Sequence, residues 1–232
     1  MAISYSKVKR VFIEEMGTRF LIIGQSPDVF QKRHLGQFKT DNMYNLKVIT
    51  STVRPGRKGP IVANWIAEQA QASGFFNAEV LDLGEINLPV MNEAVHPIMK
   101  QYAHEHTKAW SDKIEEADAF IFVTAEYDYS YPAPLKNALE YLVHEWSTKP
   151  AAIVSYSIGA FAGVRAAKEL KNDLLSLRCI SIAEMVNVPL LDEYIAEDGT
   201  FNPNAQIMKA ANTMFPALNK WTKGLEAIRK DQ

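Results

Sequence analysis

The strongest constraint on the fold is an alternation of short apolar runs with helical segments, which begins at Leu46. Strands are predicted at Leu46–Ser51, Ala78–Leu83, Ala119–Thr124, Ala151–Ser155 and Cys179–Val186. Helices are predicted at Pro60–Ala72, Tyr102–Ala117, Pro134–Leu142, Gly163–Leu177 and Thr213–Ile228. Short strands that are apolar throughout and alternate with helices are typical of an α/β protein whose parallel sheet is covered on both faces.

Right-handed crossovers leave few orders in which five parallel strands can lie. For a chain of 232 residues we expect the order 2-1-3-4-5, a flavodoxin-like three-layer sandwich with helices on both faces of the sheet. This order reverses between the first and third strands. The loops after strands one, three and four therefore meet around one crevice, where ligands of open α/β sheets bind.

Residues 1–45 differ from the rest of the chain because they show no sustained apolar period. We expect them to form a poorly ordered N-terminal extension, followed by one domain over residues 46–232. Met43 lies just before the first predicted strand, so a gene model that starts too early is an alternative origin of the extension. Glu14 and Glu15 argue against a mitochondrial transit peptide, a class of segment that is poor in acids.

Composition narrows the classes of partner and the compartment. A formal net charge of −2 provides no basic surface for nucleic acid, and the longest apolar runs are far shorter than a membrane span. The single cysteine, Cys179, excludes an internal disulfide and is typical of a reducing compartment, so we expect a cytoplasmic protein. Cys179 lies in a predicted strand, which indicates an inert thiol in the core.

The loop after the first predicted strand has the composition of a phosphate site. It combines hydroxyls, guanidinium groups and glycines just before a helix: Ser51, Thr52, Arg54, Gly56, Arg57 and Gly59. Free N–H groups and the positive end of a helix attract anions. The loop is not a Walker A motif, because Lys58 is followed by glycine instead of serine or threonine. A solvated basic loop is the alternative interpretation.

The loop after the third predicted strand carries three aromatic rings and two carboxylates. Its residues are Glu126, Tyr127, Asp128, Tyr129, Ser130 and Tyr131. The loop joins a buried strand to a helix that begins with two prolines, so its side chains are expected at the carboxyl edge of the sheet. Rings and hydrogen-bonding groups on so short a loop indicate a flat, partly polar ring as the ligand.

Small residues follow the fourth predicted strand, in the segment S-Y-S-I-G-A-F-A-G-V-R-A-A over residues 155–167. They allow the backbone to approach a ligand, and Gly159 and Gly163 permit unusual dihedral angles. Close packing of helix on sheet is the alternative reason for the same residues. Arg165 is expected either to reach a second phosphate or to form a surface ion pair, and the sequence leaves both open.

Metal and hydrolytic sites are not predicted. His104 and His106 stand two residues apart on a predicted helix, where side chains do not face each other. Neither a cysteine cluster nor an H-E-x-x-H motif supports a metal. The G-x-S-x-G elbow of serine hydrolases is missing as well, so no side chain is assigned as a catalytic nucleophile.

Several of these motifs resemble those of the NADPH-dependent FMN reductases, a flavodoxin-like family, over roughly Leu46–Ile228. The strongest are A-E-Y-D-Y-S-Y-P-A-P-L-K-N-A-L and S-Y-S-I-G-A-F-A-G-V-R-A. The resemblance implies that FMN binds non-covalently, with its phosphate on Ser51, Arg54, Gly59, Pro60 and Ile61. It also implies that the flavin ring lies between two sets of residues, namely Glu126, Tyr127, Asp128, Tyr129 and Ser130 on one side and Ser155, Ser157 and Gly159 on the other.

The chain departs from the family pattern at two positions of the ring loop. The family usually reads E-Y-N where this chain has Asp128, and it usually has a smaller residue or a histidine in place of Tyr129. An amide can donate to a flavin carbonyl, whereas an ionised carboxylate only accepts. We therefore expect Asp128 to make the flavin harder to reduce than an asparagine would.

The resemblance implies an oxidoreductase that passes hydride from NADPH or NADH through bound FMN to a quinone, an azo compound or free flavin. A protein of this kind needs no nucleophile of its own, because the cofactor performs the chemistry. The alternatives are a flavodoxin-like electron carrier, against which the small net charge argues, and a flavin-free structural or regulatory relative.

A homodimer is also expected, through the segment from Pro134 to Trp146. Tyr141, Leu142 and Trp146 offer more apolar surface than one face of a sheet is expected to bury, and exposed apolar patches mark interfaces. The resemblance adds that related reductases pair near the flavin.

Overall fold

The computed structural model describes residues 43–231, which form a five-stranded parallel sheet in the order β2-β1-β3-β4-β5. The strands are β1 (Tyr44–Thr50), β2 (Phe76–Asp82), β3 (Ala119–Ala125), β4 (Pro150–Tyr156) and β5 (Ile180–Val188). Thr50 of β1 pairs with Val123 of β3, so the first and third strands are neighbours and the order reverses between them. The predicted flavodoxin-like topology is confirmed.

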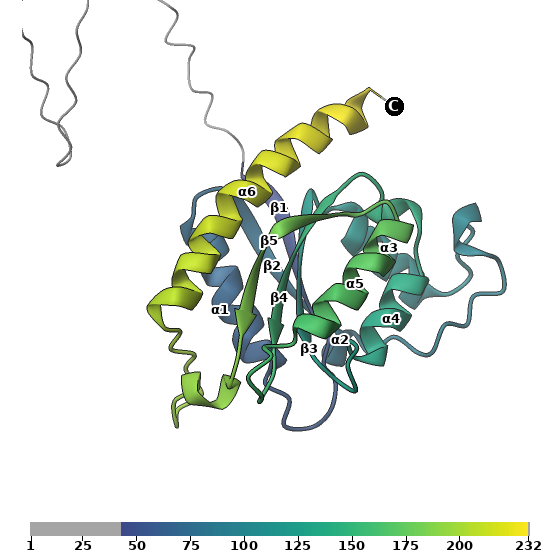
Figure 1. Cartoon of the computed structure of the whole chain (residues 1–232). Helices are drawn as coiled ribbons and strands as arrows, with labels where there is room; N and C mark the ends of the chain where they lie inside the picture. The colour runs from purple at the N-terminus through teal and green to yellow at the C-terminus, as the bar shows by residue number, and fades with distance from the viewer. Residues whose placement is uncertain (1–42, 232) are drawn as a thin grey trace, which may run out of the picture. The chain divides into compact units, whose positions relative to one another are not determined.

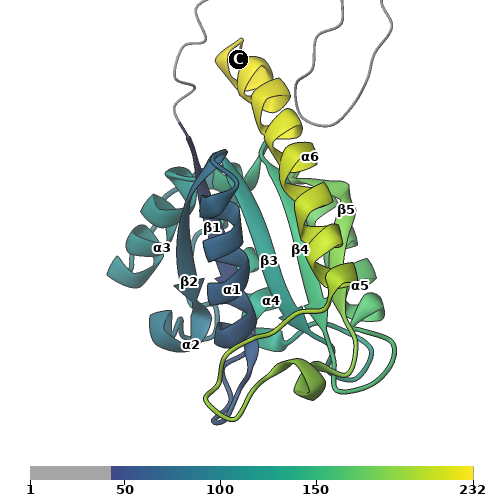
Figure 2. The ribbon, with the colours of Figure 1, turned by 90° about the vertical axis from the view of Figure 1, so that its left-hand side faces the viewer.

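Helices cover both faces of the sheet (Figures 1 and 2). On one face lie α1 (Gly59–Ala72) and α6 (Ala205–Lys230); on the other lie α3 (Glu105–Glu115), α4 (Ala133–Glu140) and α5 (Val164–Ser176). Shorter turns of helix are α2 (Leu83–Ile86), η2 (Pro97–Met99), η3 (His144–Trp146) and η4 (Leu191–Tyr194). Among the described residues, no helix has the length and apolar character needed to cross a membrane.

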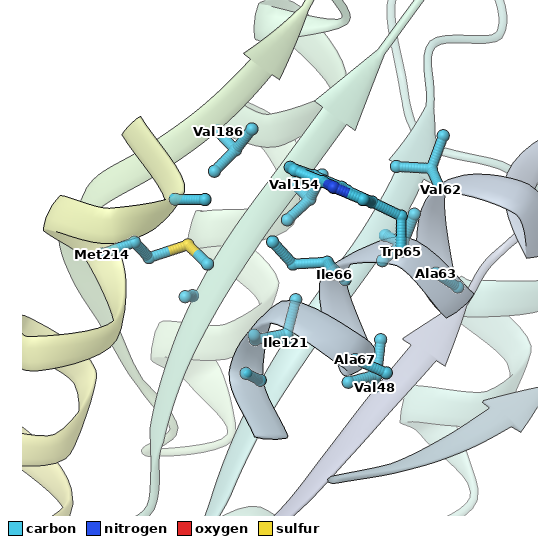
Figure 3. Close-up of a cluster of buried hydrophobic side chains, with 14 of the residues drawn as sticks. Val48, Val62, Ala63, Trp65, Ile66, Ala67, Ile121, Val154, Val186 and Met214 are labelled. Atoms are coloured by element: carbon cyan, nitrogen blue, oxygen red, sulfur yellow. The ribbon is translucent and has the colours of Figure 1, made fainter. Parts of the chain in front are cut away.

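Each strand sends alternate side chains into two separate cores, because successive residues of a strand point to opposite faces. Figure 3 shows one of these cores, where Val48, Ile121 and Val154 of three strands meet Ile66 of α1 and Met214 of α6. The intervening residues, such as Phe122 and Ile153, pack under α3, α4 and α5. Both faces of β3 and β4 are therefore buried, which is why these strands are apolar throughout.

Several predicted boundaries differ from the structure: β2 begins at Phe76 instead of Ala78, α3 at Glu105 instead of Tyr102, and β5 at Ile180 instead of Cys179. Two further differences follow from contacts outside the predicted segment. The last helix begins at Ala205 instead of Thr213, since the Asn204 carboxamide accepts a hydrogen bond from the Ile207 N–H and caps the helix. The first strand begins at Tyr44, before the expected Leu46, because it pairs with β2 from Phe76 onward. Tyr44 and Asn45, which were assigned to the N-terminal extension, therefore belong to β1. Residues 1–42 of the expected extension lie outside the described part of the chain.

The apolar residues expected at a dimer surface lie inside the core instead. Tyr141, Leu142 and Trp146 are each fully buried. The turn η3 folds back onto the sheet, so that the Trp146 ring lies 5.0 Å from the Phe120 ring. The Tyr141 hydroxyl donates to the Pro89 carbonyl. The single face of the sheet does bury them, so the prediction that they form an interface is wrong.

Candidate functional site

The loops after β1, β3 and β4, together with η4, line a pocket of about 670 Å³ at the carboxyl edge of the sheet. These loops lie side by side at the lower edge of Figure 2. The volume is within the range of small-molecule sites, roughly 300–1,000 Å³. The convergence that the strand order predicted therefore produces a cavity.

The first wall of the pocket is the start of α1. This helix begins at Gly59 with neither a side-chain cap nor an acidic residue in its first turn, and Pro60 stands at its beginning. A Cβ added to Gly59 would come within 2.4 Å of Thr52 Oγ1, 2.6 Å of Thr50 Oγ1 and 2.9 Å of the Tyr156 hydroxyl. Only glycine allows these hydroxyls to gather at the positive end of the helix, where they and the helix favour an anion.

The cationic side chains of this wall differ in what they already bind. Arg57 pairs with Asp82 at 2.9 Å, and Lys58 pairs with Asp192 of η4 at 2.6 Å. Arg54 is exposed and lines the pocket, and it has no ion-pair partner within residues 43–231. Arg54 is therefore the cation of this wall that is available to a ligand phosphate.

Tyr156, the last residue of β4, lines the pocket and was not predicted. Its hydroxyl lies 3.4 Å from Thr52 Oγ1, and burial raises its pKa to about 12, so that it remains a hydrogen-bond donor at neutral pH. The residue predicted from the sequence is its neighbour, Ser155. The Ser155 hydroxyl is fully buried and contacts Ala162 and Asn187, because the neighbouring residue on a strand points to the opposite face.

Several other predicted residues lie next to the pocket without lining it. Ser51 is fully buried and donates to Thr124. Pro60 and Ile61 form the first turn of α1, and Gly159 is exposed, with its carbonyl accepting from Ser157. The predicted residues that do line the pocket are Thr52, Arg54, Gly56, Arg57, Glu126, Tyr127, Asp128 and Ser157.

The second wall is a tight turn after β3. The backbone groups of Tyr127 and Ser130 exchange hydrogen bonds of 2.8 and 2.9 Å, and the two residues between them have positive φ values, 49° at Asp128 and 68° at Tyr129. This is the pattern of a type I′ turn, which usually contains Asn, Asp or Gly. Asp128 suits it and lines the pocket, whereas a tyrosine with positive φ is unusual.

Glu126 joins this turn to α5. Its carboxylate accepts from Arg165 Nε at 2.7 Å and lies 2.5 Å from Arg165 Nη2, while its other oxygen accepts the Arg165 backbone N–H at 3.3 Å. The Arg165 guanidinium lies over the Tyr129 ring, 4.0 Å from its centroid. Of the two roles left open for Arg165, the structure has the ion pair.

The histidine pair has a different geometry from the one expected. His104 and His106 stack at 5.1 Å with their rings 8° from parallel, because His104 precedes α3 in an extended conformation. The prediction that these two side chains do not face each other is therefore wrong. Their Nε2 atoms contact the two oxygens of Asn92. No group of three or more His, Cys, Asp or Glu residues in the described part of the chain has the arrangement of a metal site.

Cys179 lies in the core, as its strand context predicted. It is 1% exposed, and burial raises the pKa of its thiol to about 12. A thiol of this kind stays protonated at neutral pH and is a poor nucleophile.

The donors of the pocket fit a ligand with an anionic end and a flat, polar end. The anionic end would meet Arg54 and the start of α1, and the flat end would lie between the Tyr127–Ser130 turn and Ser157. A buried hydroxyl without a hydrogen-bond partner, Thr50 Oγ1, stands beside Gly59, behind this anionic end. FMN has both features, a phosphate and an isoalloxazine ring.

Comparison with known proteins also leads to FMN. A model of the family described as NADPH-dependent FMN reductase matches residues 45–191. An NAD(P)H-dependent FMN reductase of Schizosaccharomyces pombe is 36% identical over 182 residues, which are 78% of this chain and 90% of that protein. A quinone reductase of Pseudomonas putida is 32% identical over 149 residues, which are 61% of this chain and 76% of that protein.

Solved structures share the fold. The flavoenzyme FerB of Paracoccus denitrificans, an NAD(P)H:(acceptor) oxidoreductase, has a TM-score of 0.61 at 24% identity. The match covers 78% of this chain and 98% of that one.

Proposed function

The chain belongs to the NADPH-dependent FMN reductase family, and from this premise we propose that it is an FMN-dependent oxidoreductase. It takes electrons from NADPH or NADH and delivers them to a small-molecule acceptor such as a quinone, an azo compound or free flavin. The observation that carries the proposal is one pocket with two different ends. At one end Arg54, which has no ion-pair partner in the described part of the chain, lies beside the uncapped start of α1, and at the other end lies the polar, aromatic turn after β3.

The phosphate end holds the cofactor by charge and by hydrogen bonds. Arg54 provides a charge-assisted contact, and the start of α1 adds its backbone donors and its positive dipole. The Thr52 and Tyr156 hydroxyls, both nearly buried, provide further donors. Arg57 and Lys58 are held by Asp82 and Asp192, so they raise the local potential and position the loop.

The ring end orients the reactive part of the cofactor. Tyr127 and Asp128 stand on a turn whose two cross-strand hydrogen bonds restrict its motion, and Ser157 faces them from the loop after β4. FMN, when bound, supplies the two-electron chemistry that links a nicotinamide to an acceptor. The protein's part is to bind, to orient and to exclude water, and no acid, base or nucleophile of the chain is assigned to the reaction.

A first experiment separates this function from its alternatives. The purified chain is expected to show flavin absorbance after incubation with FMN and removal of the excess, and to bind FMN more tightly than riboflavin. It is expected to oxidise many equivalents of NADPH or NADH per bound FMN once a quinone is added. FMN binding without this oxidation would indicate an electron carrier. Failure to bind FMN at micromolar concentration would indicate a flavin-free relative and would contradict the proposal.

The oligomeric state and compartment extend the proposal. We infer a homodimer through the connection between α2 and α3, because its apolar side chains Val90, Ile98 and Met99 are 86%, 53% and 58% exposed. Sedimentation of the Met99→Glu and Val90→Asp variants as monomers, against a dimeric parent, would support this surface. A cytoplasmic location is in line with the single buried thiol, and fractionation of cells tests it.

A further inference from the structure

Three large apolar side chains stand exposed at the ring end of the pocket. Tyr129, Phe161 and Ile158 are 67%, 69% and 78% exposed, although they belong to the two loops that flank the cavity. Ile158 itself lines the pocket, and Tyr129 directly follows Asp128, which also lines it. The apolar side chains are therefore gathered beside the opening through which a substrate has to reach the bound cofactor.

Arg165 joins the two aromatic rings into one surface. Its guanidinium lies 4.0 Å from the Tyr129 centroid and 5.0 Å from the Phe161 centroid. The planar guanidinium stacks well on aromatic faces, and such contacts hold the rings in place. We call Tyr129, Phe161 and Arg165 together the rim platform.

Glu126 removes the net charge of the rim platform. Its carboxylate contacts the Arg165 guanidinium at 2.5 and 2.7 Å, and the Glu126 side chain is only 8% exposed, against 45% for Arg165. Both oxygens are used, since the second accepts the Arg165 backbone N–H. The guanidinium thus contributes a flat stacking surface while its charge is already compensated.

The backbone at Tyr129 indicates that the ring has a use other than stability. Its φ of 68° belongs to the left-handed region, where glycine is favoured and bulky residues are uncommon. An exposed ring in this position buries little surface, so the folded state gains little from it. Strained positions of this kind gather at ligand sites.

From these observations we propose that the rim platform docks flat, uncharged aromatic electron acceptors of the quinone class, and that Glu126 sets this preference by neutralising Arg165. The proposal rests on the proposed function and assigns specificity within it. Anionic acceptors such as sulfonated dyes are disfavoured, because Arg165 and Glu126 cancel each other's charge, and the Asp128 carboxylate, which has no ion-pair partner among residues 43–231, lines the pocket.

The test measures binding instead of turnover. Menadione, an uncharged 1,4-naphthoquinone, and 9,10-anthraquinone-2-sulfonate, a flat anionic quinone, are titrated calorimetrically into the oxidised protein without NADPH. Tyr129→Gly removes one ring and relaxes the turn, and Phe161→Ala removes the other. Each variant is expected to bind menadione about three- to tenfold more weakly, the range of a single stacking contact.

Leu175→Ala is the matched control. Leu175 is 71% exposed and lies near the far end of the same α5 helix, so its removal changes exposed apolar area without touching the platform. Menadione affinity is expected to stay at the parent value in this variant. An equal loss in all three variants would overturn the proposal, because it would reflect general hydrophobicity.

Glu126→Gln tests the charge argument. The substitution keeps the size and an acceptor oxygen but leaves Arg165 with an uncompensated charge. Binding of the sulfonate is expected to tighten about tenfold, while menadione changes by less than about twofold. Unchanged sulfonate affinity would overturn the role of Glu126. Arg165→Gln with Glu126→Gln, a pair without either charge, is expected to lose this gain again.

FMN loading, read from absorbance, distinguishes a failure of the proposed function from a failure of the rim platform proposal. Loss of FMN from the parent chain contradicts the proposed function, whatever the platform binds. The titrations are made in either case, because the platform consists of side chains alone. FMN-loaded parent protein that binds the two probes equally well would overturn the platform and leave the proposed function standing.

Discussion

The two ends of the pocket are built on different principles. At the phosphate end, a glycine, an uncapped helix and one unpaired arginine lie within a few residues of each other in sequence. At the ring end, the side chains are positioned by contacts between residues far apart, above all Glu126 with Arg165. The first end follows from local backbone physics, whereas the second depends on the assembled tertiary structure. Substitutions at the phosphate end should therefore change mainly FMN affinity, and substitutions at the ring end should change mainly the reduction potential and the binding of acceptors.

The largest effect is expected from filling the space beside Gly59. In Gly59→Ala, the new Cβ would meet hydroxyl oxygens of Thr50, Thr52 and Tyr156 at less than 3.0 Å, so the loop has to shift. FMN affinity should fall at least about 100-fold, and overpacking should lower stability by roughly 1–3 kcal/mol. Fluorescence titration and thermal melting measure the two effects.

Gly224→Ala is the control for Gly59→Ala. Gly224 lies within α6, and an added Cβ meets nothing within 4 Å. Alanine is the better helix former by roughly 1 kcal/mol, so this variant should melt slightly higher and bind FMN normally. If Gly59→Ala also bound FMN normally, the convergence of hydroxyls at the start of α1 would have no part in binding.

The second effect concerns Arg54, the cation at the start of α1 that has no ion-pair partner among residues 43–231. A partly desolvated, charge-assisted contact contributes about 1.5–3 kcal/mol, so Arg54→Ala should weaken FMN about tenfold to a hundredfold. Riboflavin, which has no phosphate, should bind the variant and the parent equally well. Arg57→Ala is the comparison, because Arg57 already pairs with Asp82 and its loss should lower the melting temperature more than FMN affinity. An Arg54 variant with unchanged FMN affinity would remove this residue from the site.

The third effect concerns the ring end, where the charge of Asp128 should change the reduction potential of FMN more than the affinity for FMN. Reduction adds negative charge beside the Asp128 carboxylate, which lines the pocket. Two like charges about 4 Å apart repel by about 4 kcal/mol at an effective dielectric of 20, before relaxation. Asp128→Asn should therefore raise the midpoint potential, by up to about 90 mV for a two-electron couple. Identical potentials in a potentiometric titration would mean that Asp128 points away from the ring.

A smaller effect on FMN affinity is expected from Tyr156, which lies at the phosphate end of the pocket. Because burial raises its pKa to about 12, the phenol stays protonated and can donate to a phosphate well above pH 10. Parent FMN affinity should show no loss attributable to this group between pH 9 and 11. The protonated group also favours the folded state below pH 10, and this contribution is lost as the pH rises towards 12.

Tyr156→Phe removes the donor and keeps the ring. FMN should bind a few-fold more weakly, about the value of one neutral hydrogen bond, 0.5–1.5 kcal/mol. Difference absorbance of tyrosinate should show one titrating group fewer above pH 11 in the variant. If the missing group instead titrated near pH 10, Tyr156 would be accessible to water and the explanation by burial would be wrong.

The same comparison explains which features the sequence reveals. The strand order and the proposed anion site follow from short-range patterns, such as the apolar run 119–123 and the glycine that opens α1. Ser155 was predicted to face the ligand, but the side chain that lines the pocket belongs to Tyr156. Successive residues of a strand point to opposite faces of the sheet, so an error of one residue reverses the predicted face. The Glu126–Arg165 pair joins residues 39 positions apart, and only the packing of α5 brings them together. The burial of Trp146 likewise depends on η3 folding back over Phe120, which no local pattern indicates.

The smallest effect is expected from shortening the chain, because both ends of the pocket consist of residues between Thr52 and Asp192. Within residues 43–231, β1 is the first strand and begins at Tyr44, and the strand pairings of the five-stranded sheet lie downstream of that residue. We therefore expect a chain that begins at Met43 to bind FMN with the parent affinity and to melt within a few degrees of it. Calorimetry and the same FMN titration make the comparison. A fall in solubility or in FMN affinity would show that residues 1–42 contribute to the domain, and both ends of the pocket would then have to be described with a further segment.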